Sequence, residues 1–385
     1  MARTSALLIL ILLTTACRER PEKAAPLPEA AVDNPVEIDY AKGFAAHTDA
    51  SGVTYLTVSD PWPEASREYK YALVPRGKLA AITLPADTFD AIIPVPVERL
   101  VLTSTTHVPS LVALRATESL VGFPGLDYIS SPEVRQRIDA GAVRELGANE
   151  QLNTELVLEA APEVVVGFGI SDAPGSYRGV REAGIPVIYN GDWMETNPLG
   201  KAEWIKFFGL LLGSLPEAQQ YFEEVEAAYQ EARELAAKAS TRPTVLSGAL
   251  YRDVWYLPGG ESWAAAFLED AHAEYLYADT PGSGSLSLSL EAVLEKGVDA
   301  EFWISPSQYT SYSEMASDNP HYEQFRAFRE RRIFGYASNR GSGGGLLYFE
   351  IGPNRPDWVL KDLIHHLHPG LLHGYEPVFF KPLAP

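Results

Sequence analysis

Apolar residues along this chain occur at two spacings, one typical of buried strands and one typical of helices. Between residues 97 and 190 the short apolar runs "RLVL", "LVGF", "VVVGF" and "PVIY" alternate with helix-like stretches. The same alternation returns after residue 241, through "TVLSG", "EFWIS" and "RIFGYA". Short apolar strands that alternate with helices predict parallel βαβ units, whose sheets are covered on both faces. The pattern therefore predicts an α/β protein with two Rossmann-like lobes.

The stretch between the two series has a helical spacing only. "NPLGKAEWIKFFGLLLG" predicts one amphipathic helix, and the residues from Pro216 to Lys238 predict a second, unbroken one. Proline at the first turn favours a helix start there, and at the usual rise the second helix would be ~34 Å long. We expect residues 91–213 to form an N-terminal lobe, residues 214–240 a connecting helix, and residues 241–385 a C-terminal lobe.

Two segments precede the first lobe. Residues 37–90 contain stretches such as "GVTYLTVSD" that alternate apolar and polar residues between turn signals, which predicts a small antiparallel β element. Residues 1–16 have Arg3, a short apolar run and small residues, which is the layout of a secretory signal peptide.

Cys17, the single cysteine of the chain, follows this signal directly. Its position resembles the lipidation site of bacterial lipoproteins, although Thr14 stands where that family prefers leucine. We expect a lipid on Cys17, a flexible tether over residues 17–36, and a protein anchored on the outer side of a bacterial membrane. An ordinary cleaved export signal is the alternative.

Composition is that of an ordinary soluble domain pair, with 385 residues of which 46% are hydrophobic and 21% charged. The formal net charge of −20 argues against nucleic-acid binding, because there is no basic face to neutralise phosphates.

The order of segments resembles the substrate-binding proteins of ABC importers that carry iron–siderophore complexes, haem or cobalamin. The resemblance covers about residues 97–372 and depends on "VERLVLTSTTHVPSLVAL", "LNTELVLEAAPEVVVGF", "NPLGKAEWIKFFGLLLG" and "LYFEIGPNRPDWVLKDLIHHLHP". It implies two lobes joined by one rigid helix and a ligand held between them. A ferric siderophore is the favoured ligand and cobalamin the alternative. The implied protein is a monomer that performs no chemistry and carries no cofactor.

Two segments repeat one unit, with Glu155 in "LNTELVLEAAPEVVV" and Glu291 in "LSLSLEAVLEKGVDAEFWI". The resemblance implies that these glutamates dock to arginines of a dimeric ABC permease. Each glutamate would lie in the first turn of a helix, where the helix dipole favours a carboxylate. The alternative is a helix-capping role without any partner.

Ligands of open α/β sheets bind beyond the carboxyl ends of the strands, so the loops that follow the strands should line the cleft. These loops are rich in aromatic residues, which offer flat walls, and in arginines, which bind anionic oxygens. We expect about half of the aromatic residues to pack in the cores instead. The candidate ligand-binding residues are His107, Phe168, Tyr189, Trp193, Tyr251, Arg252, Trp255, Trp263, Arg340 and Tyr348, with Tyr309 and Arg178 as further members of the same loops.

Three motif-like strings do not predict a catalytic or metal site. "HHLH" at residues 365–368 would place its side chains on different faces of one helix. His107 alone does not make a metal site of three or four ligands. "GSGGG" at residues 341–345 lacks the ending of a phosphate-binding loop. A metal-cluster or chelatase-type enzyme on the same fold remains the alternative outside the class of binding proteins.

Overall fold

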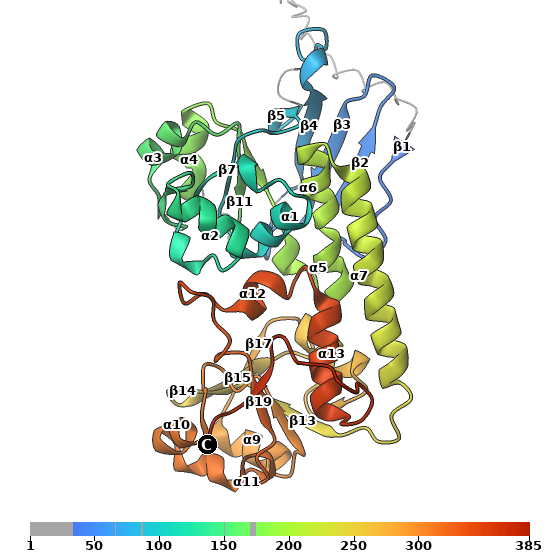
Figure 1. Ribbon diagram of the computed structural model, residues 1–385, viewed down its shortest axis with the longest axis vertical. Coiled ribbons are helices and arrows are strands. Elements are labelled where there is room, and N and C mark those ends of the chain that lie inside the picture. The colour runs from blue at the N-terminus through green and yellow to red at the C-terminus, as the bar shows by residue number, and fades with distance from the viewer. Residues whose placement is uncertain (1–33, 66, 86–87, 150, 170–174) are drawn as a thin grey trace, which may run out of the picture.

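The computed structural model describes residues 34–65, 67–85, 88–149, 151–169 and 175–385 (Figure 1). The predicted signal peptide and Cys17 lie outside these described residues, as does most of the tether. Within the described ranges, no helix has both the length and the hydropathy needed to cross a bilayer.

The N-terminal lobe contains a five-stranded parallel sheet with the strand order β12-β11-β6-β7-β8. Its strands are β6 (Leu100–Leu102), β7 (Leu120–Phe123), β8 (Arg144–Glu145), β11 (Val164–Gly167) and β12 (Val187–Tyr189). Its helices are α1 (Val108–Ala113), α2 (Pro132–Asp139), α3 (Thr154–Ala160) and α4 (Gly175–Glu182), and a small ladder joins β9 (Gly147–Ala148) to β10 (Gln151–Leu152). The apolar runs form the central strands because both faces of this sheet are covered.

The C-terminal lobe repeats this design with the strand order β16-β13-β18-β19-β20, in which only β20 is antiparallel. These strands are β13 (Thr244–Ser247), β16 (Glu274–Tyr275), β18 (Phe302–Ile304), β19 (Ile333–Gly335) and β20 (Lys381–Pro382). A second sheet holds β14 (Ala249–Tyr251), β15 (Val254–Pro258) and β17 (Ser285–Leu288). The helices are α8 (Trp263–Asp270), α9 (Leu290–Gly297), α10 (Tyr312–Asp318) and α11 (Arg326–Arg329).

A single unbroken helix, α7 (Leu215–Ala236), runs along the side of both lobes (Figure 1). This confirms the predicted connecting helix. The C-terminal helix α13 (Pro356–Leu367) packs against it, and the short helix α12 (Leu347–Ile351) lies between the two lobes.

The stretch before α7 differs from the prediction of one amphipathic helix. It forms two helices, α5 (Pro198–Glu203) and α6 (Ile205–Leu212), which meet at Trp204. Both are almost entirely buried, because the lobes, α7 and the β element that precedes the first lobe cover them on several sides. A helix buried all round does not need the polar face that the sequence pattern suggested.

The predicted β element is a five-stranded sheet, called here the N-terminal sheet. It comprises β1 (Asn34–Pro35), β2 (Phe44–Thr48), β3 (Thr54–Val58), β4 (Tyr69–Pro75) and β5 (Ala91–Val95). The first four strands are antiparallel as predicted, but β5 pairs in parallel with β4, so the sheet extends past residue 90.

The N-terminal sheet shares its core with the N-terminal lobe. The ring of Phe44 lies 4.6 Å from that of Trp204, and the ring of Trp62 lies 4.9 Å from that of Tyr189. The buried carboxylate of Glu203 accepts hydrogen bonds from the backbone N–H groups of residues 39, 40 and 41. These bonds hold the segment between β1 and β2 against α5. The sheet is therefore an integral part of this lobe.

Candidate ligand-binding site

A cavity of about 560 Å³, called here the first cavity, lies between the lobes. Its floor is made by residues that follow three adjacent strands of the N-terminal lobe, Thr103 after β6, Pro124 after β7 and Phe168 after β11. The C-terminal lobe contributes Arg340, the segment from Gly344 to Leu346, and Phe349. The position agrees with the general rule that ligands bind beyond the carboxyl ends of parallel strands.

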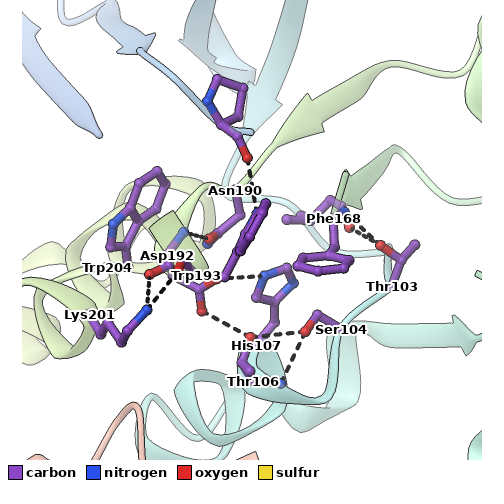
Figure 2. A network of polar contacts seen from close by, with 12 residues as sticks. Thr103, Ser104, Thr106, His107, Phe168, Asn190, Asp192, Trp193, Lys201 and Trp204 are labelled. Carbon is purple, nitrogen blue, oxygen red and sulfur yellow. Dashed lines mark hydrogen bonds and ion pairs between the residues drawn. The ribbon is translucent and has the colours of Figure 1, made fainter. Parts of the chain in front are cut away.

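A polar turn after β6 shapes this floor. Ser104 caps the short helical turn Thr105–His107 by accepting a hydrogen bond from the N–H of Thr106, and its hydroxyl lies 3.0 Å from that of Thr106. The Thr106 hydroxyl donates to the Oδ2 atom of Asp192 at 2.9 Å. Figure 2 shows this network, which connects a residue of the cavity wall to a buried carboxylate.

Asp192 is held in its ionised form inside the protein. Burial acts to raise its pKa, but His107, Lys201 and the Thr106 hydroxyl outweigh burial, so the pKa lies below the ordinary value. The Nε2 atom of His107 lies 3.8 Å from Oδ1 of Asp192 (Figure 2). Lys201 donates to the carbonyls of Asp192 and Trp193 at 2.9 Å each, and burial lowers the pKa of Lys201 to about 8 against the opposing effect of Asp192 and Glu195.

Aromatic residues from both lobes form the walls of the first cavity. Phe123, Tyr128 and Phe168 come from the N-terminal lobe and Phe349 from α12 of the C-terminal lobe. Tyr128 is 65% exposed and Phe349 43% exposed, which leaves large faces of both rings free for a ligand. Such walls fit a ligand with flat or apolar faces.

Among the described residues that line the first cavity, Arg340 alone carries a charge. Its guanidinium donates to the carbonyls of Ala337 and Gly344 and to the side-chain oxygen of Gln308, at 3.0 to 3.1 Å. These neutral acceptors orient the group and leave its positive charge for an anionic ligand.

The loop that follows Arg340 packs closely on the N-terminal lobe. A Cβ atom on Gly343 would lie 2.0 Å from the carbonyl oxygen of Asp127, and one on Gly345 would lie 2.1 Å from that of Tyr128. Only glycine allows this approach. The glycine-rich string is therefore a packing element that closes the first cavity.

A second cavity of about 300 Å³ lies within the C-terminal lobe, at the carboxyl ends of β13, β18 and β19. Ser247, Ser305 and Tyr336 line it at these strand ends, and the hairpin of β14 and β15 adds Tyr251 and Tyr256. The ring of Tyr336 lies 5.2 Å from that of Phe349, so the walls of the two cavities meet at this contact.

The predicted site residues separate into cavity residues and buried residues. Phe168 and Arg340 line the first cavity, and Tyr251 lines the second. Arg252 adjoins Tyr251 at the exposed tip of the same hairpin, where its guanidinium lies over the Tyr251 ring. Arg178 and Tyr309 are not among the residues that line either cavity.

The prediction that Trp255 contacts ligand is wrong. Its side chain is fully buried and stacks on Trp303 at 5.2 Å, with its Nε1 atom donating to the carbonyl of Ser247. The turn that follows β15 suggested an exposed tryptophan, but the residue lies within the strand and faces the core.

His107 and Tyr189 also belong to the interior. His107 has no exposed surface, and Tyr189, at 8% exposure, packs among Trp62, Tyr69 and Tyr177. His107 lies after β6 and Tyr189 ends β12, as predicted. However, α6 packs on His107, and the N-terminal sheet packs on Tyr189. In this structure they support the site from behind.

Trp193, Trp263 and Tyr348 lie one layer behind the cavity walls. Trp193 packs against Phe168 with ring centres 5.7 Å apart, and its Nε1 atom donates to the carbonyl of Pro61. Trp263 stacks on Tyr348 at 5.7 Å, and Tyr348 stacks on Tyr336 at 4.7 Å. These aromatic rings fix the orientation of the residues that line the cavities.

The histidines of "HHLH" have structural contacts. The Nε2 atom of His366 lies 3.0 Å from the carbonyl of Phe380, and that of His368 lies 2.8 Å from the carbonyl of Ala271. Within the described residues, no group of three or more His, Cys, Asp and Glu side chains is arranged to hold a metal ion.

The two repeated glutamates occupy equivalent positions. Glu155 is the second residue of α3 behind the cap Asn153, and Glu291 is the second residue of α9 behind the cap Ser289. Both carboxylates are exposed. The backbone N–H of Glu291 and the Ser289 hydroxyl lower the pKa of Glu291, which keeps it ionised.

Sequence reasoning missed Phe123, Tyr128 and Phe349. The first two lie at and after the end of β7, so the rule that located the other cleft loops would have found them. Phe349 adjoins the candidate Tyr348 after the glycine-rich loop, and the position of α12 between the lobes decides that Phe349 and not Tyr348 lines the first cavity.

The structure has two α/β lobes with mainly parallel sheets, one long helix along both, and a cavity between them. These features define the class of bilobal substrate-binding proteins. The model of the periplasmic binding protein family matches residues 100–339, and the chain belongs to this family.

Known relatives extend over most of the chain. An uncharacterized lipoprotein of Methanocaldococcus jannaschii is 27% identical over 358 residues, which cover 90% of this chain and 80% of the relative. A periplasmic heme binding protein from Pseudomonas aeruginosa is similar in structure with a TM-score of 0.57 and 20% identity, over 75% of this chain and 99% of that one. An ABC-type Fe³⁺-hydroxamate transport system from Saccharomonospora viridis is similar with a TM-score of 0.52 and 20% identity, over 71% and 94% of the two chains. These structures have the same fold.

Proposed function

We propose that this protein captures a metal chelate in the first cavity and delivers it to an ABC importer, with a ferric siderophore as the favoured ligand. The observation that carries the proposal is the first cavity itself, which is lined by aromatic residues of both lobes and by one cation, Arg340, that forms no ion pair with a residue the structure describes. Its volume of about 560 Å³ lies within the usual range for small-molecule sites of about 300 to 1,000 Å³. The protein performs no chemistry on the ligand.

The lining favours a chelate over a bare ion. None of the described residues that line the first cavity is a histidine, cysteine, aspartate or glutamate, the side chains that most often bind metal ions. A chelate brings its own donor atoms, presents flat or apolar faces to the aromatic residues, and often carries negative charge for Arg340. The similarity to an Fe³⁺-hydroxamate transport protein supports this assignment.

Haem is the second candidate, because several structural neighbours are described as heme-binding. A flat macrocycle would lie against Tyr128 and Phe349, and its carboxylates would meet Arg340. Cobalamin is the third ligand to be compared.

Delivery requires a partner in the membrane. Glu155 and Glu291 present equivalent carboxylates on the two lobes, which would suit a permease dimer with twin cationic sites. A lipid on Cys17 would keep the protein at the outer side of the membrane, and one relative is described as a lipoprotein.

The test is a titration of the purified protein with a ferric catecholate, a ferric hydroxamate, haem and cobalamin, followed by quenching of intrinsic fluorescence. We expect saturable binding of one of the iron compounds. The Arg340→Gln variant should bind it about tenfold more weakly, equivalent to ~1.4 kcal/mol. Arg178→Gln is the matched control, because this exposed arginine lines neither cavity.

The proposal fails if no compound gives saturable binding. It also fails if Arg340→Gln and Arg178→Gln have equal effects. Tight binding of cobalamin alone would replace the iron chelate by a corrin as the ligand.

A further inference from the structure

The second cavity is built at the ends of three adjacent strands of the C-terminal lobe, and each end supplies a hydroxyl group. Ser247 is the last residue of β13, Ser305 follows β18, and Tyr336 follows β19. Neighbouring parallel strands end at one edge of the sheet, so these three groups converge. Ser307 and Tyr256 add two more hydroxyl groups to the same lining.

These hydroxyl groups are free to bind a ligand. The side-chain hydroxyls of Ser247, Ser305, Ser307, Tyr256 and Tyr336 form no hydrogen bond with any residue that the structure describes. Ser247 is only 3% exposed, and its backbone carbonyl already accepts the indole N–H of Trp255. The five hydroxyl groups therefore remain available to a partner from outside the chain.

The backbone holds two of these serines in an uncommon conformation. Ser305 and Ser307 have φ angles of 59° and 56°, in the left-handed region that residues other than glycine seldom adopt. The N–H of Ser307 donates to the carbonyl of Ser305 at 2.8 Å, and the same carbonyl accepts from Gly248 at 3.2 Å. Strained residues of this kind concentrate at binding sites, where the surrounding structure maintains them.

The chemistry of the lining selects a neutral ligand. None of the described residues that line the second cavity is charged, whereas the first cavity contains Arg340. A charged group placed here would lose its hydration without gaining a counter-charge. Hydroxyl groups both donate and accept hydrogen bonds, and the rings of Tyr256 and Tyr336 offer apolar faces. A ring that carries several neutral hydroxyl groups matches both features.

We propose that the second cavity is a subsite for a neutral polyhydroxylated ring. The wall of this cavity meets that of the first through Tyr336 and Phe349, so the subsite adjoins the first cavity. The inference adds a chemical group to the ligand of the proposed function. It rests on that function in one respect, namely that the ring is part of the chelate. A free sugar would have the same chemistry, and the experiment separates the two sources.

The first arm compares two ferric catecholates that differ only in a neutral hexose attached to one of them. We expect the hexose-bearing chelate to bind about tenfold more tightly to the unmodified protein. The double variant Ser247→Ala/Tyr336→Phe should remove this difference. The matched control Ser104→Ala/Tyr128→Phe deletes the same kinds of hydroxyl in the first cavity, so it should weaken both chelates alike and keep the difference.

The second arm uses methyl glucoside, methyl galactoside and methyl mannoside without any chelate, observed by saturation-transfer NMR. Thermal unfolding tests whether each variant folds. If the double variant does not fold, Ser285→Trp replaces it, because Ser285 lies at the exposed rim of the second cavity.

Each outcome is decisive. Equal dissociation constants for the two chelates, or a difference that persists in the second-cavity variant, overturn the inference and leave the proposed function standing. If neither chelate binds but a glycoside does, and the variant loses it, the subsite holds a free sugar and the link to the chelate is overturned. If neither chelate and no glycoside binds, the inference fails, and the titration with the four compounds alone decides the proposed function.

Discussion

Glu350 of the C-terminal lobe accepts two hydrogen bonds from Ser131 of the N-terminal lobe, one from the backbone N–H at 2.9 Å and one from the hydroxyl at 2.7 Å. The same carboxylate accepts the N–H of Ser130 at 2.6 Å and is 1% exposed. A few residues further on, Asn354 accepts from the Ser110 hydroxyl and donates to the carbonyl of Thr106. The lobes therefore share a polar contact beside the cavity, in addition to the helix α7.

Glu350→Ala should lower the free energy of unfolding by about 2 to 4 kcal/mol, because it leaves buried donors of Ser130 and Ser131 without an acceptor. Urea unfolding measures this loss. Hydrogen exchange should also become faster in residues 126–131, which a purely local effect within α12 would not produce. Glu376→Ala is the control, since this glutamate of the C-terminal lobe is exposed. Equal effects of the two substitutions would contradict the assigned contact.

Gly343→Ala should weaken ligand binding without unfolding the protein. Its Cβ atom would lie 2.0 Å from the carbonyl oxygen of Asp127, so the 341–345 loop must move away from the N-terminal lobe and take the wall of the first cavity with it. We expect the dissociation constant of the chelate to rise about tenfold. Gly77→Ala is the matched control, because nothing lies within 4 Å of its added Cβ. Unchanged affinity in the first variant would show that the close contact is dispensable.

The pair Glu155→Gln and Glu291→Gln should abolish uptake by cells and leave ligand affinity unchanged. Both residues are exposed at the second position of their helices and line neither cavity, so the substitution removes charge from the surface only. Transport of radioactive iron chelate and fluorescence titration measure the two properties. Glu217→Gln, in the exposed first turn of α7, is the control and should transport normally. A parallel loss of affinity and uptake would argue against docking.

The protein should lose stability in acid through His366. Burial lowers the pKa of His366 to about 4, with smaller effects of His365 and Lys381 in the same direction and an opposing one from the carbonyl of Phe380. Between pH 6.5 and 4 the unfolded chain binds this proton and the folded chain does not, so stability falls as the pH falls. Relative to His366→Gln, the loss between pH 6 and pH 4.5 should be about 2 kcal/mol.

Chemical unfolding of both proteins at a series of pH values checks this difference. The other titrating groups are common to the two proteins and cancel in the comparison. A constant difference across this range would show that His366 titrates normally in the folded protein.

Much of the fold could be predicted because it depends on local chemistry. The strands Leu120–Phe123 and Val187–Tyr189 form within the predicted runs "LVGF" and "PVIY", since continuous apolar runs between turn signals leave few alternatives. The long helix follows from its proline start and from residues that favour helix throughout. Asn153 caps α3, because its side chain accepts the N–H groups that the first turn leaves free.

The parts that failed depend on segments distant in sequence. The N-terminal sheet packs against the face of Tyr189, and no local sequence pattern predicts that this residue is buried there. Trp255 is buried because Trp303, Tyr322 and Phe325 surround it. Phe349 lines the first cavity because the 341–345 loop places α12 against the other lobe.

The sequence by itself determined the two α/β lobes, the unbroken helix that connects them, and the equivalent helix positions of Glu155 and Glu291. These features follow from the spacing of apolar residues and from the residues that cap helix ends, both of which act over a few neighbouring residues. Only the tertiary structure decided which aromatic residues face a ligand and which face a core. An aromatic side chain has the same apolar surface in either place, and its burial is set by whichever distant segment packs against it.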